Sequence, residues 1–135
     1  MRYVIDSTVL IQLALAGGHL GPLEGQELVA PPILASEYTS TISELSYRGE
    51  VPVDVARRAI EELPNYPIWY ERPKGLQQRA WSVAQEIGWP KTYAAEYVAL
   101  ATLMRSPLVT LDARLRRAAG HMVEIPLVTE IAPLS

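Results

Sequence analysis

Short apolar strands alternate with helices along this chain, and the alternation restricts the possible folds more than any other feature. The run RYVID, residues 2–6, is β-branched and aromatic and ends in an acid, and the apolar helix STVLIQLALA follows it directly. Strands that alternate with helices predict a mainly parallel sheet covered by helices on both faces. The sequence therefore predicts an α/β fold with three layers, α/β/α.

The same alternation continues toward the carboxyl terminus. A length of 135 residues suits one domain, so we expect a single domain over residues 1–135. Further strands are expected at 28–30, as a short edge strand within 67–73, at 107–112 and near 125–129. Further helices are expected from Pro31-Pro32 to about Tyr47, and over 53–63, 76–87, 91–105 and 113–120.

Composition excludes several classes of site. The chain has no cysteine, which excludes disulfides, thiolate zinc sites and cysteine nucleophiles. Its two histidines, His19 and His121, are far apart and are expected on the surface or in loops. A net charge of -3 means that a nucleic-acid partner must be met by a local basic patch. No run approaches the roughly 20 apolar residues that span a bilayer, so we expect a cytoplasmic protein with no membrane partner.

Three acids stand where a parallel sheet collects its ligands. Asp6 and Asp112 each follow a predicted strand, and ligands of such sheets bind outside the carboxyl ends of the strands. Each of these two acids is equally well placed as a helix N-cap. Glu37 lies at the margin of the apolar stripe of its helix, where a carboxylate needs compensation. If the three converge, carboxylates with water would select a hard cation such as Mg²⁺ or Mn²⁺.

Three sequence blocks carry a resemblance to a known family. In order they read VIDSTVLIQLAL, APPILASEYTSTISEL and TYAAEYVALATLMRSPLVTLDARLRRAA. They resemble the signature blocks of PIN-domain proteins, in particular the VapC toxins of toxin-antitoxin pairs, and they cover nearly the whole chain. The resemblance implies a compact α/β/α domain, usually a homodimer, that cleaves RNA with Mg²⁺ or Mn²⁺ at clustered carboxylates and is inhibited by a VapB-type antitoxin.

The resemblance also assigns roles to individual residues. Asp6, Glu37 and Asp112 match the family's metal-binding acids, and Thr8 matches a small hydroxyl residue beside the first of them. The fourth family acid belongs to a Tyr-Asp-Ala motif, but Ala94 stands in its place here. Natural divergence and a deliberate inactivating change would both leave this alanine.

Glu96 is not expected to replace the missing acid. Two residues along a helix correspond to a rotation of about 200°, so the side chains at 94 and 96 point to different sides. We therefore expect Glu96 to be a solvated or interface residue.

Binding RNA requires positive charge near the acids. Arg114, Arg116 and Arg117 follow Asp112 directly, with Lys91 as a second source, and these four with Thr8 are the candidate RNA contacts. A solvated helix face accounts for the arginines equally well.

Aromatic residues offer further contacts. Base stacking is one role for the aromatic side chains, although core or interface packing is the commoner one. The candidates are Tyr66, Trp69, Tyr70, Trp81 and Trp89. A second apolar set is a candidate for a groove that binds a partner in a dimer or an antitoxin: Tyr38, Ile42, Leu45 and Tyr47.

The leading hypothesis is a metal-dependent endoribonuclease that Ala94 weakens or inactivates. The alternative is a non-catalytic module that keeps the PIN fold and binds antitoxin or RNA. A phosphoacceptor receiver domain is disfavoured, because the second acid lies within a helix and no lysine stands at a strand end.

Overall fold

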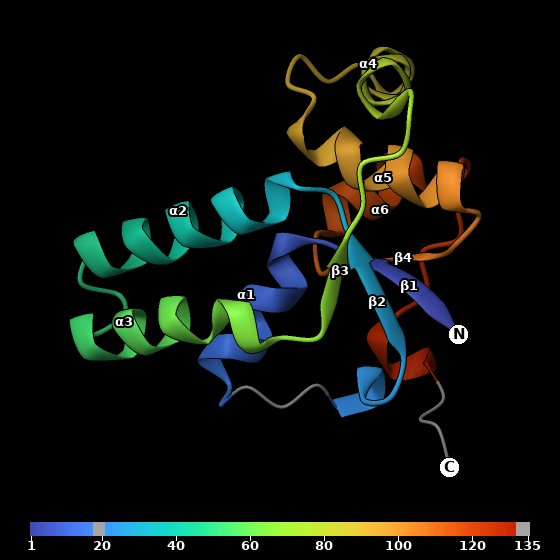
Figure 1. Ribbon diagram of the computed structural model, residues 1–135. Helices are drawn as coiled ribbons and strands as arrows, with labels where there is room; N and C mark the ends of the chain where they lie inside the picture. Colours follow the sequence, from blue (N-terminus) through green and yellow to red (C-terminus); the bar gives the residue numbers. More distant parts are fainter. Residues whose placement is uncertain (18–20, 132–135) are drawn as a thin grey trace.

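Four parallel strands form the centre of the protein in a computed structural model, which describes residues 1–17 and 21–131 (Figure 1). The sheet has the order β3-β2-β1-β4, and every neighbouring pair is parallel. The strands are β1 (Arg2–Ile5), β2 (Glu27–Ala30), β3 (Ile68–Tyr70) and β4 (Leu108–Val109). This confirms the predicted parallel sheet, including the short edge strand. His19 lies outside the described residues.

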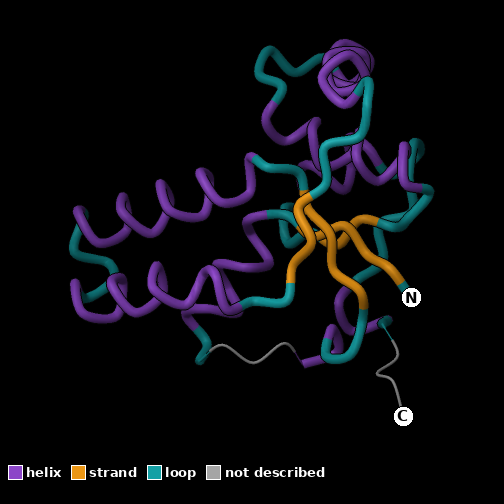
Figure 2. The backbone as a smooth tube through the Cα atoms, viewed as in Figure 1, coloured by secondary structure: helices purple, strands orange, loops and turns teal. Residues whose placement is uncertain are grey.

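Helices account for most of the remaining chain and surround the sheet (Figure 2). They are α1 (Ser7–Leu15), α2 (Ile33–Tyr47), α3 (Val53–Glu62), α4 (Leu76–Ile87), α5 (Tyr93–Met104) and α6 (Ala113–Ala119), with short 3-10 turns at Gly21–Leu23, Leu63–Asn65 and Val128–Glu130. These bounds agree with the predicted helices to within two residues. Helices α2 and α3 form a hairpin that extends away from the sheet (Figure 1). Within the described residues, no helix has the length and apolar character needed to cross a membrane.

Both faces of the sheet are buried at β1, β2 and β4, which explains why these strands are mostly apolar, whereas the edge strand β3 is partly exposed. Val4 of β1 faces the larger core, together with its β2 partner Val29. Helix α5 belongs to this core, and all of its residues from 95 to 101 are buried. The opposite face forms a smaller core that includes Tyr3, Ile5, Leu28 and Val109, covered by Val9, Leu23 and Ile131. The side chains thus alternate between two layers of packing, as the pleat requires.

The prediction of a strand near residues 125–129 is wrong. This segment is a loop that leads into the 3-10 turn Val128–Glu130. One backbone hydrogen bond joins β4 to the residue just before this segment: the Leu108 N–H donates to the Glu124 carbonyl at 2.9 Å. Pro126 follows closely, and a proline has no N–H with which to continue a ladder.

The strands position the functional residues at one edge of the sheet. Because all four run in the same direction, the residues that follow their carboxyl ends lie along a common edge. Asp6 follows β1, Thr110 follows β4, and Arg72 comes shortly after β3. Pro31 and Pro32 follow β2 and lead into α2, which carries Glu37.

Candidate active site

Asp6 is the most buried acid at this edge. It is the N-cap of α1, where its Oδ1 accepts a hydrogen bond from the Val9 N–H at 3.3 Å. Thr8 donates its hydroxyl proton to the same oxygen at 2.6 Å, and Thr110 donates to Oδ2. The residue is only 4% exposed. Both oxygens are therefore held in fixed positions.

The two threonines also join the first and last strands of the site. Thr8 Oγ1 accepts from the Leu111 N–H at 3.0 Å, and Thr110 Oγ1 accepts from the Asp112 N–H at 3.0 Å. Because each hydroxyl accepts from a backbone N–H, its own proton is free to point at Asp6. The turn after β4 is thus fixed to the turn after β1.

The ionised form of Asp6 is unfavourable in this environment. Burial raises the pKa of the Asp6 carboxyl above its usual 3.8, and the nearby charge of Asp112 adds to the rise. The hydrogen bonds from Thr110, Thr8 and the Val9 N–H oppose the rise without cancelling it. A positive charge beside Asp6 would relieve both causes.

Of the two roles that the sequence left open for Asp112, the structure confirms the N-cap, and the role in a cation site stays a prediction. It is the N-cap of α6, and its Oδ1 accepts from the N–H groups of Arg114 at 2.9 Å and Leu115 at 3.2 Å. Its Oδ2 accepts no hydrogen bond from the described part of the chain. Its charge also acts on Asp6, so the residue that caps α6 lies near the first acid.

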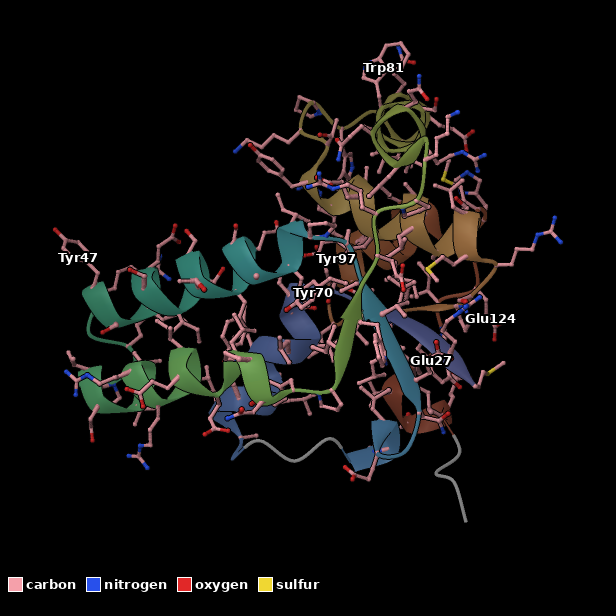
Figure 3. The ribbon with its side chains drawn as sticks, in the orientation of Figure 1. Glu27, Tyr47, Tyr70, Trp81, Tyr97 and Glu124 are labelled. Carbon is pink, nitrogen blue, oxygen red and sulfur yellow. The ribbon has the colours of Figure 1, made fainter. Side chains whose placement is uncertain are left out.

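Glu37 reaches the edge through Tyr97. The Tyr97 hydroxyl donates a hydrogen bond to Glu37 Oε1, and Tyr97 itself is 2% exposed. Burial, the hydrogen bond to Glu37 and the charges of Glu37 and Asp6 all raise the pKa of Tyr97, which therefore stays protonated. Figure 3 places Tyr97 where the start of α2 meets the sheet. Tyr97 is not among the site residues predicted from the sequence, although it follows Ala94 by three positions and so shares its helix face.

Glu96 is buried, so the solvated alternative is wrong, while a role at an interface stays a prediction. It is 6% exposed, and Gln77 of α4 donates to its Oε1 at 3.1 Å. Burial raises the pKa of Glu96, the charge of Glu37 adds to the rise, and Gln77 and Arg72 oppose it. The cause is tertiary, because α4 packs along α5 and covers this side of the helix.

Asp6, Glu37 and Asp112 have the chemistry of a cation site, but their carboxylates do not enclose a common position. Within residues 1–17 and 21–131, no three His, Cys, Asp or Glu side chains are grouped so that they could hold a metal ion together. None of the ion pairs in that part of the chain involves Asp6, Glu37 or Asp112. Mg²⁺ binds through one or two carboxylates and retains several waters. The coupled pair Asp6 and Asp112 fits such a water-rich site.

The basic candidates fall into two groups. Arg114 lies over the Trp89 ring, with its guanidinium carbon 4.6 Å from the ring centre, while Arg117 and Lys91 are exposed. Arg116 is already engaged, because its guanidinium donates to the carbonyls of Ile125 at 2.8 Å and Thr110 at 2.9 Å. It therefore braces the turn that holds Asp6.

Replacing Arg116 by alanine is expected to lower the free energy of unfolding by about 2–3 kcal/mol, because two charge-assisted hydrogen bonds are lost and buried carbonyls are left without donors. Urea denaturation measures this change. The matched control is Arg117→Ala on the same helix, expected to change stability by less than about 0.5 kcal/mol. Equal effects of the two variants would contradict the bracing role.

The apolar set on α2 does not form a groove as predicted. Tyr38 and Ile42 are fully buried, and the Tyr38 hydroxyl donates to the Ala59 carbonyl of α3 at 2.6 Å. The prediction is wrong for these two residues because α3 packs over them. Tyr47 is different: it is 93% exposed at the tip of the α2–α3 hairpin (Figure 3).

The aromatic side chains do not gather on one surface element. Trp69 on β3 is 67% exposed and Trp81 on α4 is 59% exposed. Trp81 points outward from α4 (Figure 3). Trp89 follows α4 and contacts Arg114. Of these, Trp89 is connected to the candidate site, since Arg114 lies in the first turn of the helix that Asp112 caps.

The fold and its acidic edge define a PIN-like α/β/α domain, and sequence comparison names the family within that class. No family model matches the chain. Ribonuclease VapC1 of Mycobacterium tuberculosis is 32% identical over 133 residues, covering 93% of this chain and 96% of that protein. VapC ribonuclease Mb0985 of Mycobacterium bovis is 29% identical over 126 residues, covering 93% and 97%. The chain belongs to the VapC ribonuclease family.

Solved structures confirm the fold. PAE2754 from Pyrobaculum aerophilum superposes with a TM-score of 0.72 at 21% identity, over 96% of this chain and 90% of that one. VapBC-1 from nontypeable Haemophilus influenzae gives a TM-score of 0.61 at 18% identity, over 96% and 100%. At these identities the likeness concerns the fold alone.

Proposed function

We propose that this chain is a toxin ribonuclease that hydrolyses RNA phosphodiester bonds with Mg²⁺ or Mn²⁺, in a single domain over residues 1–135. The observation that carries the proposal is the coupled pair Asp6 and Asp112 at the strand ends, which no basic side chain of the described residues neutralises. The names of the curated relatives support RNA as the substrate.

Asp6 and Asp112 would hold the cation, with Glu37 as a further ligand through a water. When bound, a divalent cation lowers the pKa of its water and polarises the phosphoryl group. The chain's own residues set the geometry around it. Thr8 and Thr110 fix the orientation of Asp6, and Tyr97 fixes one oxygen of Glu37. Arg114 and Lys91 would supply positive charge for the RNA backbone.

Ala94 removes one of the acids that the proposed cation site would otherwise have. It lies in the first turn of α5, partly buried against the core, where the family motif has an acid. Without that carboxylate, we infer weak cation binding and slow hydrolysis. The alternative function is a binding module that keeps its partner and performs no hydrolysis.

Two partners belong to the proposal. We infer neutralisation by a VapB-type antitoxin, supported by the solved VapBC-1 complex with a similar fold. We also infer a homodimer, because large apolar side chains such as Tyr47 and Val53 remain exposed on the helical hairpin.

The test is RNA cleavage by the purified chain. Slow cleavage is expected with Mg²⁺ or Mn²⁺, complete loss with a chelator, and recovery when the cation is restored. Asp112→Asn should lower the rate by roughly a hundredfold. Glu86→Gln, a change at an exposed acid of α4, is the control and should leave the rate unchanged. Cleavage that persists in the chelator would refute the cation-dependent mechanism.

A further inference from the structure

A polar pocket lies beside the proposed site at the same edge of the sheet. Its volume is about 270 Å³, which is large enough for one nucleobase. The lining residues are Pro32, Ile33, Ser36, Arg72, Gln77 and Glu96. They come from the start of α2, the segment after β3, and the first turns of α4 and α5. The proposed function does not use this pocket.

Glu96 gives the pocket a fixed acceptor. Its backbone and stem are buried in α5, and the Gln77 amide holds Oε1 at 3.1 Å. Oε2 accepts no hydrogen bond from the described residues, and none of the fully buried side-chain oxygens among them lacks a partner. Oε2 must therefore open to the pocket. A buried carboxylate with one open oxygen is an oriented acceptor for a ligand's N–H groups.

Arg72 supplies the opposite charge. It lines the same pocket and is near enough to act electrostatically on Glu96. Yet no ion pair forms between them, since no nitrogen-oxygen contact within 4.0 Å joins the two among the described residues. A carboxylate and a guanidinium thus face the same space with a gap between them. A ligand that fills the gap must present adjacent donors to one and acceptors to the other.

We propose that this pocket binds a guanine base of the RNA next to the scissile phosphate. Guanine has a ring N–H beside an exocyclic amino group, and these two donors match the carboxylate, because Oε2 is open and Oε1 keeps one lone pair beside its bond from Gln77. Its O6 and N7 are acceptors that suit a bidentate arginine. Adenine and cytosine present one amino donor each, and uracil presents a single ring N–H between two acceptors. Pro32 and Ile33 add apolar surface for the flat ring.

The position of the pocket connects it to hydrolysis, and to this extent the inference rests on the proposed function. Glu37 is close enough for its charge to act on Glu96, and it also accepts the hydrogen bond from Tyr97. The pocket and Glu37 therefore lie near each other at the same edge of the sheet, within the reach of one nucleotide. The pocket would select the nucleotide beside the cut.

Binding of GMP, AMP, CMP and UMP to the full chain, measured by calorimetry or NMR titration, tests the proposal without any cleavage. GMP should bind roughly tenfold to a hundredfold more tightly than the others. Glu96→Gln keeps the shape but puts an amide in place of the carboxylate, so this preference should vanish. Glu71→Gln is the matched control, because Glu71 precedes Arg72 but does not line the pocket.

Three outcomes would overturn the proposal: equal binding of the four nucleotides, equal effects of Glu96→Gln and Glu71→Gln, or a loss of Mn²⁺ affinity in Glu96→Gln without nucleotide. The last would make Glu96 a cation ligand. If Glu96→Gln does not fold, Arg72→Gln replaces it, since Arg72 is exposed and its change leaves the core intact. Retained GMP preference in Arg72→Gln would also overturn the proposal.

Cleavage of a random RNA pool separates this inference from the proposed function. Cuts enriched beside guanine in the wild-type chain, and no longer enriched in Glu96→Gln, support both. Cleavage without any base preference refutes the pocket and leaves the ribonuclease function standing. Selective GMP binding by a chain that cuts no RNA supports the pocket and refutes the ribonuclease function.

Discussion

Replacing Ala94 by aspartate is expected to raise the rate of RNA cleavage by about a hundredfold, the scale on which a misplaced catalytic group costs activity. Position 94 lies one helical turn before Tyr97 and on the same face, so a carboxylate there joins Glu37 and Asp6. An acid in the first turn of α5 is also favoured by the helix dipole. Mg²⁺ and Mn²⁺ should bind more tightly, and expression without an antitoxin should become toxic.

The control for this gain is Ala94→Asn, which has the same size as aspartate without its charge. It should cleave RNA no faster than the present chain. Calorimetric titration with Mn²⁺ gives a second measurement that does not depend on turnover. An Ala94→Asp variant that binds Mn²⁺ no better than Ala94→Asn would show that position 94 does not face the cation.

The fold was largely predictable because its determinants are local. Each strand is a short apolar run with a turn signal after it, and the three strands other than the edge strand β3 are buried on both faces, so periodicity and length were enough. The failure near residues 125–129 has a local cause too. Its apolar residues pack without a ladder, since Pro126 removes the N–H that pairing needs.

The candidate site was less predictable because its contacts cross between elements. The positions of Asp6 and Asp112 follow from the strand ends, but the burial of Glu96 depends on α4 covering α5. Thr110 had one signal, a hydroxyl residue directly after the apolar strand β4. The role of Arg116 had none, because its partners are backbone carbonyls of Thr110 and Ile125, which lie outside its own helix and carry no side-chain signal.

Asp6→Asn is expected to reduce RNA cleavage by at least about a hundredfold while making the cation-free protein more stable at pH 7. The loss of activity follows from removing the most firmly held carboxylate of the proposed cation site. The gain in stability follows from the raised pKa of Asp6, whose charge is costly where it is buried near Asp112. Thermal unfolding in a chelator measures it. Added Mg²⁺ should raise the midpoint of the wild-type chain and leave that of Asp6→Asn almost unchanged.

The pH dependence of this difference tests its cause. Because the pKa of Asp6 is higher in the folded than in the unfolded chain, the folded state binds the proton more tightly, and lowering the pH stabilises the wild-type chain. That contribution is complete below the unfolded value of about 3.8 and is lost as the pH rises through the folded value. The advantage of Asp6→Asn should therefore be largest at neutral pH and shrink on acidification. A variant that is less stable than wild type by a constant amount from pH 7 to pH 4 would show that the threonine hydrogen bonds outweigh burial.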